Sequence, residues 1–219
     1  MEKINTTAAH NIAVIGANGG IGKQTVEAAL RAGHYVTAIV RAPASLDLEH
    51  PNLRIVKGDV FDARTLESHL AHKDAVISAI GKTSLKPTTL YSQGNKNVIE
   101  AMLKAGVSRA FFISASGLEV NPTHALPVRF ATKYILQKLL HNMYADLEIM
   151  ENIIRKSNIS WTILRPPRLI DQSATANYRI AINAVLKNSL RISRADVAHF
   201  MVNNIDNEAI LKKTVEIGY

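Results

Sequence analysis

The amino-acid sequence predicts an α/β fold in which one parallel sheet carries helices on both faces. Apolar, β-branched segments alternate with longer helical segments along the chain. A glycine-rich turn joins the first strand to the first helix, and the 219 residues contain no linker, internal repeat or low-complexity tract. Because a helix between two strands makes a right-handed crossover, this alternation gives a Rossmann-like, doubly wound parallel sheet within a single domain.

The predicted elements follow one another at short intervals, and glycine and proline mark many of their ends. Gly106, for example, is expected to end the helix that follows the fourth strand. Strands are expected at 12–15, 34–40, 53–57, 74–80, 109–114 and 159–164, with helices at 23–32, 63–71, 87–104 and, broken near residue 142, 128–156. The rest of the chain is expected to add a strand at 178–182, a helix at 193–204 that Ser193 caps, and a last strand at 214–217.

The glycine-rich turn is Gly16-Ala17-Asn18-Gly19-Gly20-Ile21-Gly22, directly after the first strand. In such a turn the first glycine permits the tight bend, the second allows backbone to approach a pyrophosphate, and the third lets the helix pack against the strand. The free N–H groups and positive dipole end of the helix favour phosphate. The motif therefore predicts dinucleotide binding. Its alternative is a merely tight strand–helix turn.

The end of the second strand indicates which dinucleotide is bound. NAD sites usually carry Asp or Glu there, to hold the ribose hydroxyls. This chain carries Arg41, whose guanidinium suits a 2′-phosphate, and Lys23 or Ser45 could assist it. We therefore expect NADP(H) in preference to NAD(H), the alternative being that Arg41 is a solvated surface cation.

Composition limits the remaining function classes. The absence of cysteine excludes disulfides and thiolate metal sites, and the eight histidines show no metal-binding spacing, so no metal is expected. The chain has neither a signal-peptide pattern nor an apolar run of membrane-spanning length, which predicts a cytoplasmic protein without membrane contact. The net charge of +8 favours anionic ligands, but the cations are dispersed and aromatic residues make up 5%, so nucleic acid is not the expected partner.

Several later motifs occur together with the glycine turn over nearly the whole chain. They are Val40-Arg41, Gly58-Asp59-Val60, Asp74-Ala75-Val76-Ile77, Gly81, Pro87-Thr88-Thr89, Arg165-Pro166-Pro167 with Asp171-Gln172, and the stretch from Ser193 to Phe200. In this order they resemble the atypical short-chain dehydrogenases/reductases, a group that includes NADPH-dependent flavin reductase, also called biliverdin-IXβ reductase, and the NmrA-like proteins.

The resemblance implies an NAD(P)-binding domain over residues 1–219, with a disordered tail at about 1–10 and a substrate-side segment at about 166–219. It also implies a role for each matching position. The turn from Gly16 to Gly22 would hold the pyrophosphate together with Asn18, and Arg41 the 2′-phosphate. Asp59 and Val60 would flank the adenine, Ala79, Ile80 and Gly81 would line the ribose side, Ser114 would face the nicotinamide, and Pro166, Pro167 and Arg168 would lie beside the carboxamide.

Three departures from the resemblance bear on the function: two of them leave the substrate open, and the third concerns the preference for NADP(H). Flavin and biliverdin reductases of this group carry a serine one place after Ser114, where this chain has Ala115. The segment from Thr123 to Tyr144 is longer than in the flavin reductases and is similar to longer NmrA-like members. A second arginine that often supports the 2′-phosphate is replaced by Ser45.

A tyrosine–lysine pair adds a candidate proton donor. Tyr134 and Lys138 have the i, i+4 spacing that places two side chains on one helix face, where an ammonium lowers the pKa of a phenol. Such pairs are common by chance, and the alternative is a core-edge tyrosine beside a surface lysine. Ser114, Tyr134 and Lys138 are thus the candidate catalytic residues.

Three functions remain open at this point. The first is an NADPH-dependent reductase that transfers hydride to a planar small-molecule acceptor such as FMN or another flavin, a quinone or a biliverdin-like molecule, which needs no dedicated acid. The second is a non-catalytic NADP(H) sensor that binds a protein partner. The third is a sugar or isoprenoid epimerase/reductase that uses Tyr134 and Lys138.

Overall fold

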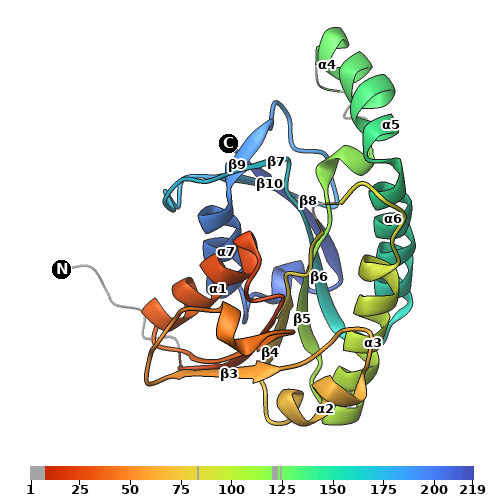
Figure 1. Ribbon diagram of the computed structural model, residues 1–219. Helices are drawn as coiled ribbons and strands as arrows, with labels where there is room; N and C mark the ends of the chain where they lie inside the picture. The colour runs from red at the N-terminus through yellow and green to blue at the C-terminus, as the bar shows by residue number, and fades with distance from the viewer. Residues whose placement is uncertain (1–7, 83, 120–122, 124) are drawn as a thin grey trace, which may run out of the picture.

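An eight-stranded sheet forms the centre of the molecule, in the order β3-β2-β1-β4-β5-β6-β10-β8 (Figure 1). The computed structural model describes residues 8–82, 84–119, 123 and 125–219. All neighbouring strands are parallel except β8, which pairs antiparallel with β10 at one edge. The strands are β1 (Asn11–Ile15), β2 (Tyr35–Val40), β3 (Leu53–Lys57), β4 (Ala75–Ser78), β5 (Arg109–Ile113), β6 (Ser160–Arg165), β8 (Arg179–Ile182) and β10 (Lys213–Gly218).

Helices cover both faces of this sheet, as the alternating sequence predicts. Figure 1 shows α1 (Gly20–Arg31) and α7 (Arg194–Asn203) on one face and α2 (Arg64–Leu70), α3 (Leu90–Ala105) and α6 (His141–Lys156) on the other. Side chains alternate across β1, so Ile12 and Val14 pack into one core and Ala13 and Ile15 into the other. The doubly wound α/β fold is therefore confirmed.

The position where the strand order reverses determines where a ligand can bind. Strands β2 and β3 lie on one side of β1, and β4, β5 and β6 lie on the other. The connections after β1 and β4 leave the sheet in opposite directions, which opens a crevice at their carboxyl ends. The glycine turn, residues 16–22, lies at this switch point because it directly follows β1.

The first helix begins earlier than the sequence indicated. It starts at Gly20 rather than residue 23, because Gly19 adopts an extended conformation and Lys23 N–H already donates to the Gly19 carbonyl oxygen at 2.8 Å. The helix expected from 87 begins at Leu90, and Gly106 ends it with a left-handed φ of 72°. The ST-type bond from Leu90 N–H to Thr88 Oγ1, at 3.1 Å, holds the chain just before that helix.

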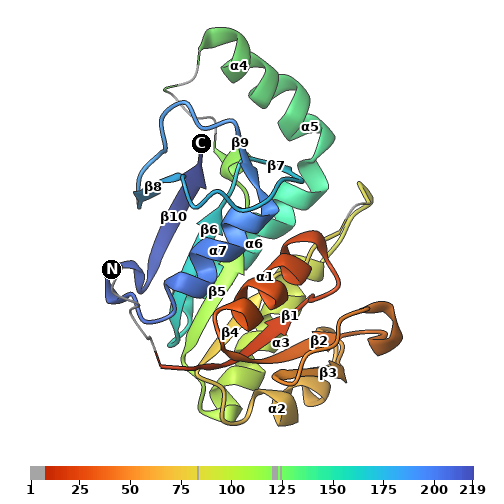
Figure 2. The ribbon, with the colours of Figure 1, turned by 90° about the vertical axis from the view of Figure 1, so that its left-hand side faces the viewer.

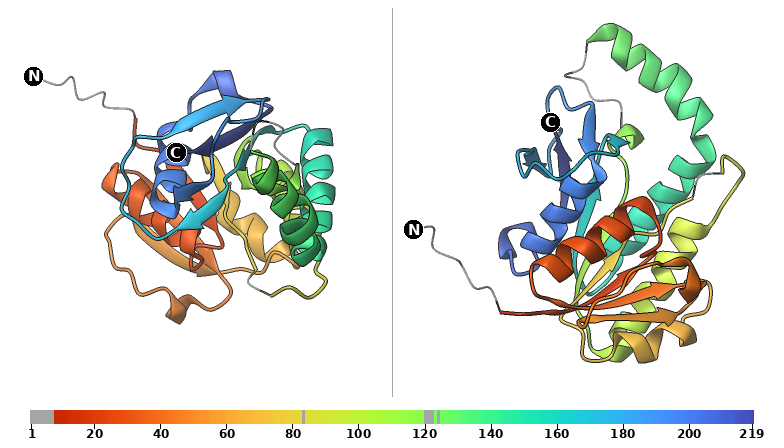
Figure 3. Two further views of the ribbon diagram at one scale, coloured as in Figure 1. Left: turned by 90° about the horizontal axis from the view of Figure 1, so that it is seen from above. Right: turned by 60° about the vertical axis from the view of Figure 1, so that its left-hand side comes forward.

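A small second sheet, which the sequence did not indicate, lies in the C-terminal segment. Strands β7 (Arg168–Ile170) and β9 (Arg191–Ser193) pair in parallel and lead respectively away from β6 and into α7. Seen from above, this segment arches over one end of the molecule (Figure 3). Three-residue strands have too little periodicity to recognise in sequence. Three short 3₁₀ turns, η1 (Pro43–Ser45), η2 (Ser116–Leu118) and η4 (Glu208–Ile210), complete the connections.

A helical arm projects from the body between β5 and α6 (Figures 2 and 3). It comprises α4 (Leu126–Ala131), the π-helical turn η3 (Thr132–Leu136) and α5 (Gln137–Leu139). The break from α6 falls at Leu140, with φ −99° and ψ 15°, two residues before the predicted break. Residue 124 of the long segment considered above lies outside the described residues.

The predicted N-terminal tail lies mostly outside the described residues, which begin at residue 8. His10 is packed rather than free: its Nε2 lies 2.8 Å from Asp206 Oδ2, and its backbone N–H donates to His34 Nδ1 at 3.1 Å. Across the described ranges, the helices are all too short or too polar to cross a bilayer.

Candidate nucleotide and acceptor site

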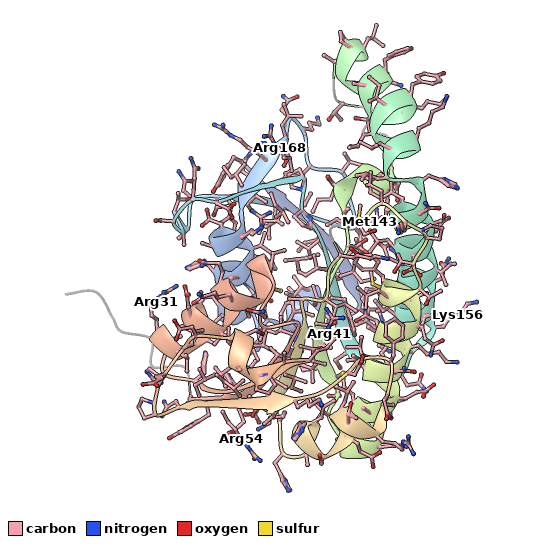
Figure 4. All side chains as sticks on the ribbon, viewed as in Figure 1. Arg31, Arg41, Arg54, Met143, Lys156 and Arg168 are labelled. Carbon is pink, nitrogen blue, oxygen red and sulfur yellow. The ribbon has the colours of Figure 1, made fainter. Side chains whose placement is uncertain are left out.

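A cavity of about 1020 Å³ opens at the carboxyl ends of the central strands. Its walls come from the glycine turn, from the ends of β2, β4, β5 and β6, from α6 and from the C-terminal segment. Figure 4 shows Arg41, Met143 and Arg168 around this space, whereas Arg31, Arg54 and Lys156 lie on the outside of the molecule. Three distant parts of the chain thus meet at the switch point.

The glycine turn forms the wall between β1 and α1. Gly16 has a φ of +76°, and a Cβ there would lie 2.8 Å from the Ala79 carbonyl oxygen, so this position requires glycine. A Cβ on Gly22 would overlap the Gly16 carbonyl oxygen, which keeps α1 close to β1. No side chain caps α1 and its first turn holds no acid, so the N-terminus of this helix is available to an anion.

The end of β2 brings a cation to the same cavity. Arg41 is exposed and lines the cavity beside Asn18 and Ser45. Asn18 Nδ2 donates to Ser45 Oγ at 3.0 Å, and Ser45 Oγ donates to the Ala42 carbonyl oxygen at 2.6 Å. These bonds fix the loop after β2 against the glycine turn. The cavity therefore has an exposed guanidinium beside a fixed loop at this point.

The loop after β3 supplies the neighbouring wall. Asp59, half-buried, accepts a hydrogen bond from Phe61 N–H at 2.9 Å through Oδ1, and its own N–H donates to Thr65 Oγ1 at 2.9 Å. Val60 is buried beside it, and Asn97 Nδ2 donates to the Val60 carbonyl oxygen at 2.8 Å. Asp59 and Val60 both line the cavity, at the end where the resemblance implies adenine.

The middle of the cavity lies over β4 and β5. Ala79, Ile80 and Gly81, to which the resemblance implies a role on the ribose side, line it. Ser114 also lines it, but its buried hydroxyl donates to Glu151 Oε1 at 2.6 Å. The proton of that hydroxyl is therefore already engaged in the hydrogen bond to the buried carboxylate of Glu151. Ser114 fits a positioning role at the end of β5 better than direct proton transfer.

The wall that comes from α6 and the C-terminal segment is apolar around Met143 but also carries Arg168, Ser189 and Glu216. Pro166, Pro167 and Arg168 follow β6 and form part of this wall, with Arg168 exposed. The apolar side chains here are Leu136, Leu140, Met143, Leu147, Leu169 and Leu190.

The candidate pair Tyr134 and Lys138 lies elsewhere. Both residues are on the helical arm and exposed, and neither lines the cavity. The ring of Tyr134 instead stacks against Phe130, with centroids 4.6 Å apart, while Lys133 Nζ lies 5.3 Å from the Tyr134 ring centroid. The i, i+4 spacing places the pair on one helical stretch, but it is Thr132 and Leu136 of this stretch that line the cavity, and Tyr134 and Lys138 do not.

Tyr144, Glu216 and Arg194 are among the cavity residues that had no assigned role from the sequence. Tyr144, on the first turn of α6, is buried with its hydroxyl beside Gly117, and burial raises its pKa. Glu216 of β10 is buried and accepts from Leu186 N–H at 2.8 Å. Arg194 begins α7 and lies against Gly20. The sequence held one usable signal, the Ser193 cap, which marked the helix that delivers Arg194 without indicating where it points.

The fold and the cavity define a Rossmann-type dinucleotide-binding protein. The model of an NAD(P)H-binding family matches residues 16–208, so the chain belongs to this family. An uncharacterised chloroplastic protein of Arabidopsis thaliana is 30% identical over 99% of this chain and 79% of its own length. The eugenol synthase 1 of Petunia hybrida is 31% identical over 52% of this chain, which spans only 38% of that enzyme.

Solved structures agree with the fold. A candidate NADH-flavin reductase from Streptococcus pneumoniae TIGR4 superposes with a TM-score of 0.76 at 28% identity, covering 96% of this chain and 99% of that one. The family resemblance inferred from the sequence is therefore confirmed. The cavity also fits the NAD(P)H that the family binds, since Gly16 and Gly22 have no room for a Cβ and an uncapped helix N-terminus faces it.

Proposed function

We propose that the protein is an NADPH-dependent reductase that transfers hydride to a planar acceptor, such as a flavin, a quinone or a biliverdin-like molecule. The observation that carries this proposal is the continuity of the cavity. One end has the glycine turn and Arg41, and the other is the apolar wall around Met143. Relatives that include the candidate flavin reductase of Streptococcus and phenylcoumaran benzylic ether reductase of Nicotiana tabacum support reductase chemistry.

In this proposal some residues bind the nucleotide and others orient the acceptor. The glycine turn and the α1 N-terminus hold the pyrophosphate, Asp59 and Val60 flank the adenine, and the ends of β4 and β5 support the ribose and nicotinamide side. The chemistry that NADPH supplies when bound there is hydride transfer. The apolar wall excludes water and stacks a flat acceptor, so positioning contributes most of the catalysis. A flavin can take its proton from water, which agrees with the committed hydroxyl of Ser114.

The preference for NADPH rests on Arg41. Replacing it by alanine removes the guanidinium that a 2′-phosphate would pair with and leaves the rest of the cavity intact. We expect Arg41→Ala to weaken NADP⁺ binding about tenfold or more and to leave NAD⁺ binding unchanged in calorimetric titration. Arg31→Ala, an exposed cation at the opposite end of α1, is the matched control. Equal loss of both nucleotides in Arg41→Ala would contradict the assignment.

The acceptor is tested by turnover and by filling the apolar end. We expect NADPH oxidation with FMN, riboflavin, biliverdin or a quinone, followed at the absorbance of reduced nicotinamide. Met143→Trp should raise KM for the acceptor without changing NADPH affinity, whereas Ile149→Trp, exposed on the same helix, should change neither. Tight NADPH binding without oxidation by any of these acceptors would contradict the reductase proposal.

The arm favours a second candidate, an NADP(H) sensor that binds a protein partner. Its apolar side chains are exposed: Leu126 by 75%, Phe130 by 61%, Ile135 by 61% and Leu139 by 58%. Positions 121–145 hold no Asp or Glu, while Arg129, Lys133 and Lys138 are cationic. This combination suits a partner with an apolar groove and an acidic rim.

The sensor candidate predicts an association that depends on the nucleotide and on the arm. We expect pull-downs to differ between NADP⁺ and NADPH, and the double substitution Phe130→Ser with Leu139→Ser to abolish the difference. An association that is indifferent to nucleotide and to these substitutions would count against it. The epimerase candidate gains no support from the geometry, because Tyr134 and Lys138 lie outside the cavity.

A further inference from the structure

Arg194 lies directly over the glycine turn although it comes from the other end of the chain. A Cβ on Gly20, the first residue of α1, would lie 2.6 Å from Arg194 Cδ and 2.7 Å from its Nε. The arginine stem therefore packs on the bare Cα of Gly20, and Arg194 lines the cavity at this point. Figure 2 shows α1 and α7 side by side, with both N-termini reaching the same region.

This placement puts two positive features together. The α1 N-terminus carries the positive end of the helix dipole, no side chain caps it and no acid lies in its first turn. A cation beside such a helix end is unfavourable in a free protein, because both repel positive charge. An anion bound between Arg194 and the α1 N-terminus attracts both, so the electrostatic energy of the arrangement becomes favourable. The arrangement is thus complementary to a phosphate bound at the glycine turn.

The side chain of Arg194 forms an ion pair with Asp171 that a phosphate could replace. Its Nη1 donates to Asp171 Oδ1 at 2.6 Å, and the Asp171 side chain is 88% exposed. An ion pair with so exposed a carboxylate contributes little to stability, so Arg194 can leave it for a phosphate oxygen at small cost. Asp171 meanwhile holds the guanidinium near the cavity rather than in solvent.

The backbone that carries Arg194 is rigidly held. Asp196, fully buried on the first turn of α7, accepts hydrogen bonds from Ser193 Oγ at 2.9 Å and Tyr219 Oη at 2.5 Å. It also accepts from the backbone N–H groups of Thr175 and Ala176, each at 2.8 Å. This one carboxylate ties together the start of α7, the loop after β7 and the C-terminus. Arg194 is therefore presented by a fixed support.

We propose that Arg194 is a second cationic residue of the nucleotide site, which binds the pyrophosphate that NADP(H) and NAD(H) share. This inference rests on the NAD(P)H binding of the family and goes beyond the glycine turn and Arg41. The two arginines then have different tasks: Arg41 selects the 2′-phosphate, and Arg194 strengthens binding of either dinucleotide. Asp171 is the carboxylate that Arg194 exchanges for phosphate.

The test compares NADP⁺ with NAD⁺ by calorimetric titration of the full chain. We expect Arg194→Met, which keeps the apolar stem over Gly20, to weaken both nucleotides by the same factor, about tenfold to a hundredfold. Arg191→Met, three residues earlier and exposed outside the cavity, should change neither. Asp171→Asn removes the competing carboxylate and should leave both affinities equal to wild type or tighter.

The outcomes separate this inference from the nucleotide assignment itself. Failure of the wild-type chain to bind either nucleotide would contradict the assignment of the site. Wild-type binding with unchanged affinities in Arg194→Met would overturn the role of Arg194 alone, and so would a loss confined to NADP⁺. Thermal unfolding without ligand shows whether Arg194→Met folds. If it does not, Arg194→Lys replaces it, with a smaller equal loss for both nucleotides expected and unchanged affinities overturning the role.

Discussion

The carboxylate of Glu151 in α6 receives two hydrogen bonds from the guanidinium of Arg165 at the end of β6. Arg165 Nε donates to Oε1 and Nη2 to Oε2, each at 2.8 Å. Ser114 Oγ and Arg155 Nη2 approach the same carboxylate at 2.6 and 2.8 Å. This buried pair fixes the ends of β5 and β6 beneath the cavity, so the floor of the site depends on a contact between a helix and a strand.

Removing the charge of Glu151 should destabilise the fold. Glu151 is 2% exposed, and Glu151→Gln leaves the guanidinium of Arg165 with the carboxylate of Glu119, which is 62% exposed and lies 2.7 Å from Nη1, as its remaining ion-pair partner among the described residues. We expect a loss of about 1–3 kcal/mol in the free energy of unfolding, measured in urea, because Arg165 loses a buried partner but keeps Glu119. Glu148→Gln, exposed on the same helix, is the control and should change it little.

The same residue predicts a pH dependence. Burial raises the pKa of Glu151, but the hydrogen bonds and charge of Arg165, with Ser114 and Arg155, outweigh burial and lower it below the ordinary 4.5. A lowered folded-state pKa gives stability that is complete above the unfolded pKa and is lost as pH falls through the folded value. The difference between wild type and Glu151→Gln should therefore shrink below pH 4.5. A constant difference would contradict the pairing.

Glu216 should show the opposite pH dependence of stability from Glu151, because its pKa is raised. Burial raises its pKa, and the hydrogen bond from Leu186 N–H and the charge of Arg165 offset this only partly, while Glu119 adds to it. A raised folded-state pKa gives stability below pH 4.5 that is lost as pH rises through the folded value. Glu216→Gln, whose amide oxygen can still accept from Leu186, should therefore be more stable than wild type at pH 7. Urea unfolding at pH 4 and 7 measures this, and equal gains at both would contradict it.

Two glycines of the turn should respond differently to alanine. A Cβ on Gly22 would overlap the backbone of Gly16, whereas a Cβ on Gly20 would meet only the flexible side chain of Arg194. We expect Gly22→Ala to lower the free energy of unfolding by about 1–3 kcal/mol and Gly20→Ala to leave it nearly unchanged. Thermal unfolding of the free protein checks both, and similar losses would argue against the packing of this turn.

The role of Tyr144 separates acceptor classes. A general acid contributes about 10²–10⁴ to rate. If the acceptor takes its proton from water, Tyr144→Phe should keep kcat nearly unchanged and alter mainly the KM of the acceptor. A fall of kcat by a hundredfold would instead make the hydroxyl, buried beside Gly117, the proton donor, and would favour a carbonyl substrate.

Most of the fold could be predicted because its signals are short-range. The apolar run of β1, the glycine turn and the left-handed Gly106 are each decided within a few residues. Local signals predicted the glycine turn and Arg41, and the family resemblance implied the other cofactor residues; all of them except Gly22 line the cavity, and their roles stay predictions. Strands β7 and β9 were not predicted, because the extended conformation of a three-residue strand is stabilised mainly by the distant strand with which it pairs.

The sequence by itself determined the doubly wound sheet, the family and the glycine turn that lines the cavity, because periodicity, turn glycines and helix ends are local properties. Only the tertiary structure decided that Arg194 contacts Gly20 and that the hydroxyl of Ser114 donates to Glu151. It also decided that Tyr144 lines the cavity and that Tyr134 does not. Each of these depends on which distant segments pack together. Sequence spacing places two residues on one helix, whereas packing determines what that helix faces.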